Sequence, residues 1–271
     1  MRQIFISLTL LFGSAAVQSA TLVAPNGYEG ENTGGNNCML IGCTGTDGGY
    51  TMYQQFYAAD QFSALSGPQY ITHIAFRPAV YTVNDIPDGF RPPGDGPWPQ
   101  GSVDYTLEDI EFSLSTTTSA IDSLSTTFGD NTGADETSVF RGAFRVVYDG
   151  SLEAANTFSV ILELDRHFLY DPSMGNLLMQ IELYSPHPNY DPDTDTYSPF
   201  FFQAVRNDGV TERVYGLSGD EVGQMDVDYN SSLPYYGFVT QFKTSVVPIP
   251  AAVWLFGSAL VSLGWMRRQQ S

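Results

Sequence analysis

Lysine is almost absent from this sequence, in which Lys243 is the only one among 271 residues. Arginine is scarce as well, so that eleven basic residues face thirty acidic ones. Three of the eleven basic residues and none of the thirty acidic ones lie in the two end segments. The part between these segments therefore has eight basic and thirty acidic residues, which gives a formal net charge of −22. Contacts to phosphates and anionic headgroups need lysine and arginine. We therefore predict that this part binds neither nucleic acid nor an anionic membrane surface.

Cysteine is also rare, and the sequence contains only Cys38 and Cys43. A structural zinc site needs four nitrogen or sulfur ligands, and no histidine lies near this pair in the sequence. Both ends of the chain indicate export, as described below, and an oxidising compartment favours disulfides. We therefore predict a Cys38–Cys43 bond that closes a short turn.

Histidine occurs three times, and His73, His167 and His187 are isolated from one another. The sequence has no Gly-x-Ser-x-Gly, His-Glu-x-x-His or phosphate-loop motif, so it offers no signature of a serine hydrolase, a zinc protease or a nucleotide site. Any two of the thirty acidic residues could form the carboxyl pair of a glycoside hydrolase, but no spacing selects a pair. We predict a protein that is not an enzyme and has no organic cofactor.

Long amphipathic helices are missing, which argues against a fold of alternating strands and helices. Instead, apolar and polar residues alternate with a period of two, as in strands with one buried face. The alternation is strongest at residues 110–114, 158–164, 177–183 and 236–242, and weaker at 52–56, 70–76, 140–148, 200–205 and 210–217. Turn-forming residues separate these segments, so we predict an all-β fold, a jelly-roll-like antiparallel β-sandwich. One short helix is expected at residues 120–124, with Ser119 as its N-cap.

The first 20 residues have the features of a secretory signal peptide. Arg2 supplies a positive charge, an apolar segment follows at residues 4–12, and small and polar residues come next. Cleavage after Ser19, or alternatively after Ala20, fits this pattern. We therefore expect the folded domain at residues 21–245, a length that suits a single all-β domain.

The C-terminal residues 246–271 form a second end signal. The turn Val247-Pro248-Ile249-Pro250-Ala251 leads into an uncharged apolar run at residues 251–266, which Arg267 and Arg268 close. This run is close to the minimum of about 17 residues for a membrane-spanning helix. The two arginines predict a cytoplasmic C-terminus. We expect a transmembrane helix that stands apart from the sandwich.

This tail resembles the PEP-CTERM sorting signal of Gram-negative bacteria in its Val-Pro-Leu-Pro-Ala variant, with Ile249 at the leucine position. The resemblance implies that an exosortase-type membrane peptidase removes the tail. It also implies anchoring in the inner membrane before processing, and the cell surface or extracellular matrix as the destination. The body is similar to an uncharacterised family of such exported β proteins at residues 21–28, 53–62, 71–78, 124–128, 175–178 and 213–216. That similarity identifies no catalytic residue in this chain.

Two proline-rich loops, residues 85–100 and 185–199, are the segments most suited to carry a binding site. Long loops on a rigid sandwich often bind ligands. Phe90 and Trp98 in the first loop and Tyr197 in the second are candidates for stacking on sugar rings. The same loops equally fit extended covers over a sheet edge.

Three aspartates, Asp191, Asp193 and Asp195, stand at alternate positions in the second loop. Oxygen ligands at this spacing are typical of a calcium-binding loop. An EF-hand also needs glycine at its sixth position and glutamate at its twelfth, where this sequence has Thr196 and Phe202. The EF-hand is therefore excluded, and both a looser calcium site and a solvated acidic loop stay open.

Three functions are compatible with the sequence. The leading hypothesis is an exported, surface-sorted, non-enzymatic protein with a structural or adhesive role in the extracellular matrix or envelope. The alternative is a carbohydrate-binding module, which differs in having a defined extracellular polysaccharide as ligand. The third is a secreted hydrolase. The expected partners are the exosortase, the membrane before processing and, for the second hypothesis, the polysaccharide.

Overall fold

The structure is a computed structural model that describes residues 19–30, 35–37, 40–43, 51–81, 98–99, 101–151, 153, 157–188, 190–191, 196–197, 200–206, 209–216, 224–225 and 236–247. Within these residues the protein is mostly strand and every strand pairing is antiparallel, which confirms the all-β, antiparallel prediction. None of the helices in these ranges is both long and apolar enough to cross a membrane. The predicted signal sequence up to residue 18 and the predicted helix 251–266 lie outside the described residues and stay predictions.

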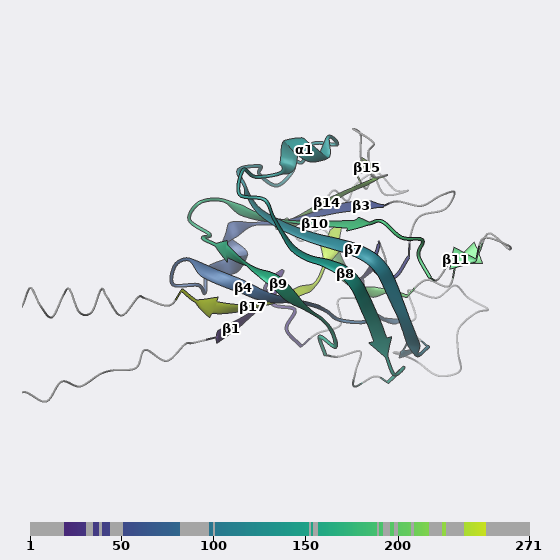
Figure 1. The fold of residues 1–271 in the computed structure, drawn as a ribbon. Helices are drawn as coiled ribbons and strands as arrows, with labels where there is room; N and C mark the ends of the chain where they lie inside the picture. Colours follow the sequence, from purple (N-terminus) through teal and green to yellow (C-terminus); the bar gives the residue numbers. More distant parts are fainter. Residues whose placement is uncertain are drawn as a thin grey trace, which may run out of the picture.

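Figure 1 shows how the strands and helices of the described residues are arranged. The elements are β1 (Ser19–Ala24), β2 (Gly35–Asn37), β3 (Met52–Tyr57), η1 (Ala59–Phe62), β4 (Gln69–Phe76), β5 (Val80–Tyr81), β6 (Trp98–Pro99), β7 (Val103–Thr117), α1 (Phe128–Asn131), β8 (Thr137–Tyr148), β9 (Val160–Tyr170), β10 (Asn176–Leu183), β11 (Tyr190–Asp191), β12 (Thr196–Tyr197), β13 (Phe202–Arg206), β14 (Thr211–Gly216), β15 (Gln224–Met225), β16 (Tyr236–Phe238) and β17 (Thr240–Val246). The strongest alternating segments fall on β7, β9, β10, β16 and β17.

Two sheets make up most of the described structure. The four-stranded sheet has the order β1-β17-β4-β9, and the six-stranded sheet has the order β15-β14-β3-β10-β7-β8. A three-stranded sheet, β16-β13-β2, and the short pairs β5-β6 and β11-β12 accompany them. β7 and β8 pair as sequence neighbours, whereas β1 pairs with β17 and brings the first and last described strands together.

The four-stranded and six-stranded sheets share one hydrophobic core. Tyr57 of β3 and Phe242 of β17 meet edge to face, with ring centroids 5.2 Å apart. Phe62 of η1 packs on the same Phe242 at 5.5 Å and on Tyr170 of β9 at 4.9 Å. All four rings are fully buried. Removing such large apolar surfaces from water is the main force that holds the sheets together.

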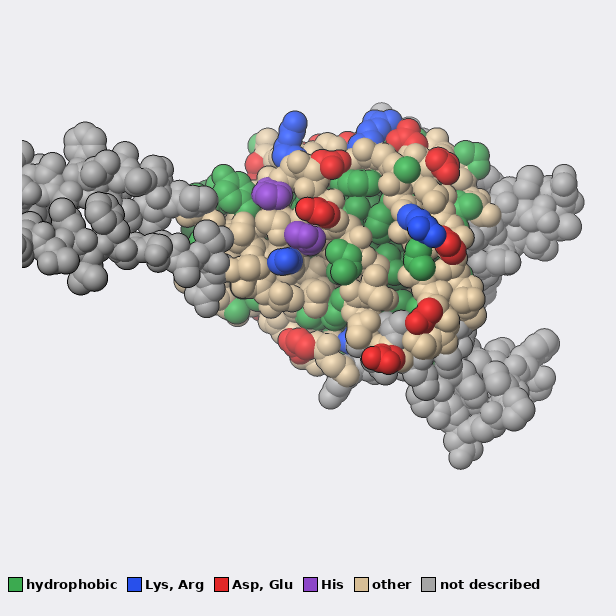
Figure 2. Space-filling view, turned by 60° about the horizontal axis from the view of Figure 1, so that its bottom comes forward, with side chains coloured by type: hydrophobic (Ala, Val, Ile, Leu, Met, Phe, Trp, Pro, Cys, Tyr) green, Lys and Arg blue, Asp and Glu red, His purple; other side chains and the backbone are tan. Residues whose placement is uncertain are grey.

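The outer face of the four-stranded sheet is largely polar. Lys243 of β17, His73 of β4 and Glu163 of β9 lie opposite one another in register. Partial burial, followed by the charge of Lys243, lowers the pKa of His73. Figure 2 shows a face on which histidine, basic and acidic side chains are interspersed with hydrophobic ones. Isolated exposed hydrophobic residues such as Ile161 are ordinary on protein surfaces.

Gln55 of β3 joins the six-stranded sheet to β16. Its side-chain amide donates to the Phe238 carbonyl at 2.9 Å and accepts from the Phe238 N–H at 2.8 Å, as a neighbouring strand would. The Tyr53 hydroxyl donates to the same Gln55 oxygen at 2.5 Å. A Cβ on Gly237 would lie 2.8 Å from the Gln55 amide, so a larger residue at position 237 would displace this amide. One fully buried side chain thus replaces part of a strand ladder.

The turn at residues 40–43 is inserted into the core. Leu40 and Ile41 are fully buried. The Ile41 carbonyl accepts from the Tyr105 hydroxyl at 2.8 Å and lies 3.2 Å from Nε2 of His187. Burial lowers the pKa of His187 to about 4, so this imidazole is neutral at neutral pH. The turn is therefore held by polar contacts to its backbone and by the packing of its two apolar side chains.

The predicted disulfide belongs to the same turn. Cys43 has no free thiol, whereas Cys38 lies outside the described residues, so the bond between them stays a prediction. Leu40 has a φ of 60°, a left-handed conformation that costs a leucine about 1–2 kcal/mol. A covalent closure of this loop would help to hold Leu40 in that conformation.

The helix predicted at residues 120–124 is wrong. This segment forms a turn in which the Ser123 hydroxyl accepts from the Ala120 N–H and donates to the Ala120 carbonyl. Asp122 has a φ of 64°, which no right-handed helix contains. Serine side chains compete with the helical backbone in this way. The short helix that does form, α1, begins four residues after the predicted one ends.

The N-terminal strand β1 is not predicted by the alternation. It begins at Ser19, so its first two residues belong to the segment that we expect to be removed with the signal peptide. Ser19 pairs with Ser245 and Ala20 with Thr244, while cleavage after Ala20 would leave residues 21–24 in the strand. The exact boundary of the domain stays a prediction.

Candidate functional site

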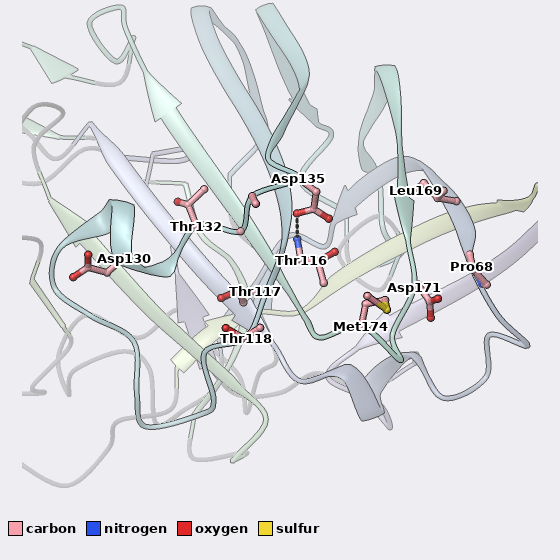
Figure 3. A pocket seen from close by; sticks show the side chains of 12 residues that line it. Pro68, Thr116, Thr117, Thr118, Asp130, Thr132, Asp135, Leu169, Asp171 and Met174 are labelled. Carbon is pink, nitrogen blue, oxygen red and sulfur yellow. Dashed lines mark hydrogen bonds between the residues drawn. The ribbon is translucent and has the colours of Figure 1, made fainter.

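A hollow opens at the end of β7, where four segments of the chain meet (Figure 3). The threonine run Thr116, Thr117 and Thr118 forms one part of its lining, and residues 130–135 form another. The third part comes from the end of β9 and the turn that follows. The hollow has a volume of about 590 Å³. Ligand sites for small molecules usually measure roughly 300–1,000 Å³.

The strap, defined as residues 118–136 between β7 and β8, covers part of the outer face of the six-stranded sheet (Figure 1). Its Leu124 forms a buried cluster with Phe56 of β3 and Leu178 of β10, and Ile121 packs against that cluster. The strap therefore has a hydrophobic core of its own, separate from the one between the sheets.

A network of buried amides also holds the strap to the sheet. The Gln54 amide of β3 donates to the Phe128 carbonyl at 3.1 Å and to the Gln180 side-chain oxygen at 2.7 Å. Asn131 of α1 donates back to the Gln54 oxygen at 2.9 Å. Gln54 and Asn131 are at most 1% exposed, so these bonds form away from water. Satisfied buried networks of this kind favour a single arrangement.

Glu212 of β14 anchors the start of the strap. Its carboxylate accepts from the Asp122 N–H at 3.0 Å and is only 2% exposed. Burial raises the pKa of Glu212 to about 7, although the hydrogen bonds from the backbone oppose that shift. One of the groups that hold the strap in place, the Glu212 carboxyl, therefore changes its charge near neutral pH.

Both sides of the hollow touch the backbone of the threonine run. The Thr116 N–H donates to Oδ1 of Asp135 at 2.7 Å. A Cβ added to Gly133 would lie 1.9 Å from the Thr116 carbonyl oxygen, and one added to Gly175 would lie 2.6 Å from that of Thr117. Glycines at these two positions therefore permit the close approach that shapes the hollow.

Three carboxylates line the hollow, and each is oriented through one oxygen. Asp130 Oδ2 accepts from the Ser125 hydroxyl at 3.0 Å. Asp171 Oδ1 accepts from both the N–H and the hydroxyl of Ser173, at 2.9 and 2.7 Å. Asp135 is oriented by the Thr116 N–H described above. A fixed carboxylate that retains a second oxygen is a ready acceptor for hydroxyl groups.

Apolar side chains complete the lining on the side of β9. Leu169 is 46% exposed and Met174 is 69% exposed, so both present apolar surface to solvent. Pro68, which precedes β4, contributes to the same side. The hollow thus presents hydroxyls and carboxylates next to an apolar surface.

Replacing Gly133 with alanine is expected to displace the strap and to lower the free energy of unfolding by about 1–3 kcal/mol, the usual cost of overpacking. The physical reason is the 1.9 Å contact that the new Cβ would make with the Thr116 carbonyl oxygen. Urea denaturation measures the stability, and hydrogen exchange of residues 125–135 measures the displacement. Gly129→Ala is the matched control on the same strap, because no atom lies within 4 Å of its added Cβ. Equal stability of the two variants would contradict the proposed close contact.

A second group of carboxylates lies on the outer face of the six-stranded sheet. Glu182 of β10, Glu111 of β7 and Arg141 of β8 are opposite one another in register. Burial, together with repulsion from Glu111 and Glu182, raises the pKa of Glu136. Arg141 binds Glu111 at 3.3 Å and stacks on Tyr184 at 4.1 Å. These contacts are those of an exposed ion-pair ladder, and we assign no chemistry to it.

The residues that the sequence singled out are only partly described. Asp191 pairs with Thr196, and Tyr197 pairs with Tyr190, in the short β11-β12 hairpin. Trp98 pairs with Tyr81 through β5 and β6. These pairings describe the backbone, and they leave stacking and calcium binding as predictions.

Several other predicted residues fall outside the described ranges, namely Phe90, Asp193, Asp195, Pro248, Ile249, Pro250, Ala251, Arg267 and Arg268. Val247 is the last described residue and is 38% exposed. Among the residues that the structure does describe, no cluster of histidine, cysteine or carboxylate groups is arranged to hold a metal ion. Calcium binding at the aspartate loop therefore stays a prediction.

Sequence reasoning missed the hollow entirely. The threonine run at the end of β7 has no period, and Asp130, Asp135 and Asp171 form no motif. The only available signal was compositional, since threonine is unusually concentrated at residues 116–118.

Comparison with protein-family models, with curated proteins and with solved structures found no match for this chain. Function is therefore inferred from the geometry of the hollow, from charge and from the signals at the chain ends.

Proposed function

We propose that this chain is an exported, surface-sorted and non-enzymatic protein that binds extracellular polysaccharide through the hollow. Its described sheets would form a jelly-roll-like sandwich. The signal peptide would direct export, the helix at residues 251–266 would anchor the precursor, and an exosortase-type peptidase would release it. The hollow carries the glycan part of this proposal, because it combines fixed oxygen acceptors with an apolar surface. The chain-end signals carry the part on sorting.

The chemistry of the hollow suits a sugar. A sugar ring presents hydroxyls around its rim and C–H groups on its faces. Asp130 and Asp171 offer carboxylate oxygens that accept from hydroxyls, and Thr118 offers a group that both donates and accepts. Leu169 and Met174 offer apolar surface for the C–H groups. Ligand sites generally combine apolar contact with a few oriented polar groups in this way.

Charge favours a neutral polysaccharide over an acidic one. Three carboxylates line the hollow, and the part of the chain between the end signals has a formal net charge of −22. Bringing uronate or phosphate groups into such a site costs electrostatic free energy. The same charge keeps the released domain dispersed in an extracellular matrix.

Replacing Asp171 with asparagine is expected to weaken polysaccharide binding about tenfold, because one charged acceptor is lost from the hollow. Isothermal titration of the released protein with the neutral polysaccharide fraction of the host matrix measures the effect. Asp149→Asn is the matched control, since Asp149 accepts from the Ser151 N–H at 2.8 Å in a similar turn. Asp149 follows Tyr148, which pairs with Val103 at the opposite end of β7 from Thr117.

Equal binding by the Asp171 and Asp149 variants would place the glycan elsewhere on the protein. Failure of the unmodified protein to bind any polysaccharide, including that of its own host, would refute the glycan ligand. The structural role in the matrix would then be the better proposal. Recovery of the full-length chain only from the host cytoplasm would refute the sorting part.

A further inference from the structure

The start of the strap closes over a buried carboxyl of the six-stranded sheet. The Glu212 carboxylate accepts from the Asp122 N–H at 3.0 Å, and the Leu124 backbone also stabilises its ionised form. Glu212 lies opposite Phe56 in the register between β14 and β3, and Phe56 packs against Leu124. The strap therefore covers this carboxyl with its backbone and with an apolar side chain.

The surroundings of this carboxyl give its charge no cationic partner among the described residues. The charged group that acts on it is Asp122 of the strap, whose repulsion opposes ionisation. On β3 the residue opposite Glu212 is the apolar Phe56. Arg213, the next residue of β14, stacks on Tyr215 and therefore lies on the other face of the strand. An ionised Glu212 under the strap is thus stabilised mainly by backbone N–H groups.

Ser125 connects the covered carboxyl to the hollow. It directly follows Leu124, and its hydroxyl donates at 3.0 Å to Oδ2 of Asp130, which lines the hollow. Its N–H donates to Oδ1 of Asn131 at 2.7 Å, and its carbonyl accepts from the Asn131 amide at 2.8 Å. The direction of Asp130 therefore depends on a segment that Glu212 holds in place.

We propose that Glu212 is a positioning residue for the hollow, because it holds the start of the strap and thereby fixes the direction of Asp130. This inference rests on the proposed function, and it adds a regulation of the same site by pH. Ionisation of a carboxyl that is shielded from water favours a state in which water reaches it. When Glu212 ionises, the start of the strap therefore lifts more often, and Ser125 orients Asp130 less often.

The hollow should consequently bind its glycan more tightly at mildly acidic than at alkaline pH. Burial raises the pKa of Glu212 to about 7, against an ordinary value of 4.5. The stability that a neutral Glu212 gives to the docked strap is complete below about pH 4.5 and is lost as the pH rises from there through about 7. Because one oriented acceptor changes affinity about fivefold, the dissociation constant should be about fivefold larger at pH 8 than at pH 5.

Three variants of the exported protein test the proposal at these two pH values. Glu212→Gln stays neutral at both and retains an oxygen that can accept from the strap. Ser125→Ala removes the hydroxyl that orients Asp130. Glu108→Gln is the matched control, because it replaces a carboxyl with an amide at an exposed position on β7. Hydrogen exchange of residues 120–127 measures the strap without a ligand, and isothermal titration with the neutral polysaccharide fraction of the host matrix measures binding.

At pH 8 the strap of the unmodified protein should exchange about tenfold faster than that of Glu212→Gln, whereas at pH 5 the two should exchange at similar rates. Binding by the unmodified protein and by Glu108→Gln should weaken about fivefold from pH 5 to pH 8, and binding by Glu212→Gln should weaken clearly less. Ser125→Ala should bind about fivefold more weakly than the unmodified protein already at pH 5.

Equal strap exchange in the unmodified protein and Glu212→Gln at pH 8 would overturn the proposal. A pH dependence of binding that Glu212→Gln retains in full would also overturn it, since the hollow would then respond to another group. Absence of binding at both pH values, together with the expected difference in strap exchange, would refute the proposed function and leave the role of Glu212 in holding the strap intact.

Discussion

Replacing Gln55 with leucine is expected to lower the free energy of unfolding by about 3 kcal/mol. Leucine fills a similar volume but leaves the N–H and the carbonyl of Phe238 without the partners that Gln55 supplies. Each buried backbone group that loses its partner costs about 1–3 kcal/mol. Urea denaturation followed by circular dichroism measures the loss. Gln241→Leu, at a partly exposed position on β17, is the control and should change stability by less than about 0.5 kcal/mol.

A second substitution shows whether the same contact is involved. Gly237→Ala places a Cβ 2.8 Å from the Gln55 amide and should also destabilise the protein. Since both changes break one contact, the double variant should lose clearly less than the sum of the two single losses. Additive losses, or a loss below about 1 kcal/mol for Gln55→Leu, would show that this amide does not join β3 to β16.

Replacing Glu212 with glutamine is expected to make the protein more stable at pH 8 than the unmodified chain, by up to about 3 kcal/mol. The pKa of Glu212 is about 7 in the folded protein, against an ordinary value of 4.5. In the unfolded chain the carboxyl therefore ionises first, and the folded state loses stability as the pH rises from about 4.5 through 7. Each pKa unit corresponds to about 1.4 kcal/mol, which sets the upper bound. Glutamine stays neutral and retains an oxygen that can accept from the Asp122 N–H.

The measurement is the urea midpoint of both proteins at pH 4.5, 6, 7 and 8. The difference between them should be small at pH 4.5 and grow until about pH 8, where the loss is complete. Asp165→Asn is the control, because it also replaces a carboxyl with an amide, but at an exposed position on β9. A pH-independent difference for Glu212→Gln would contradict the raised pKa. Hydrogen exchange of the strap at pH 8 would show whether the gain is local to residues 118–136.

The all-β fold class and the acidic charge of this protein can be read from the sequence alone, and the signals at its two ends stay predictions. Alternation is a local property, since strands with one buried face repeat every two residues whatever their partners are, and β9 and β10 follow it closely. The excess of acidic over basic residues and the apolar C-terminal run can also be read from the sequence without knowing which segments are in contact. The helix prediction at residues 120–124 failed because contacts to Ser123 and Glu212, one of them distant in sequence, outweighed a weak local preference.

The candidate site depends on contacts between segments that the chain fold brings together. Thr116, Asp135 and Asp171 lie on segments that meet because β7 ends beside the strap and because β9 turns into β10 at the same place. Their approach depends on the absence of side chains at Gly133 and Gly175, a requirement that exists only once the backbones are side by side. Alternation indicates which face of a strand is buried, but it does not indicate which strand lies beside it. The position of the hollow near the end of β17 follows from long-range strand pairings.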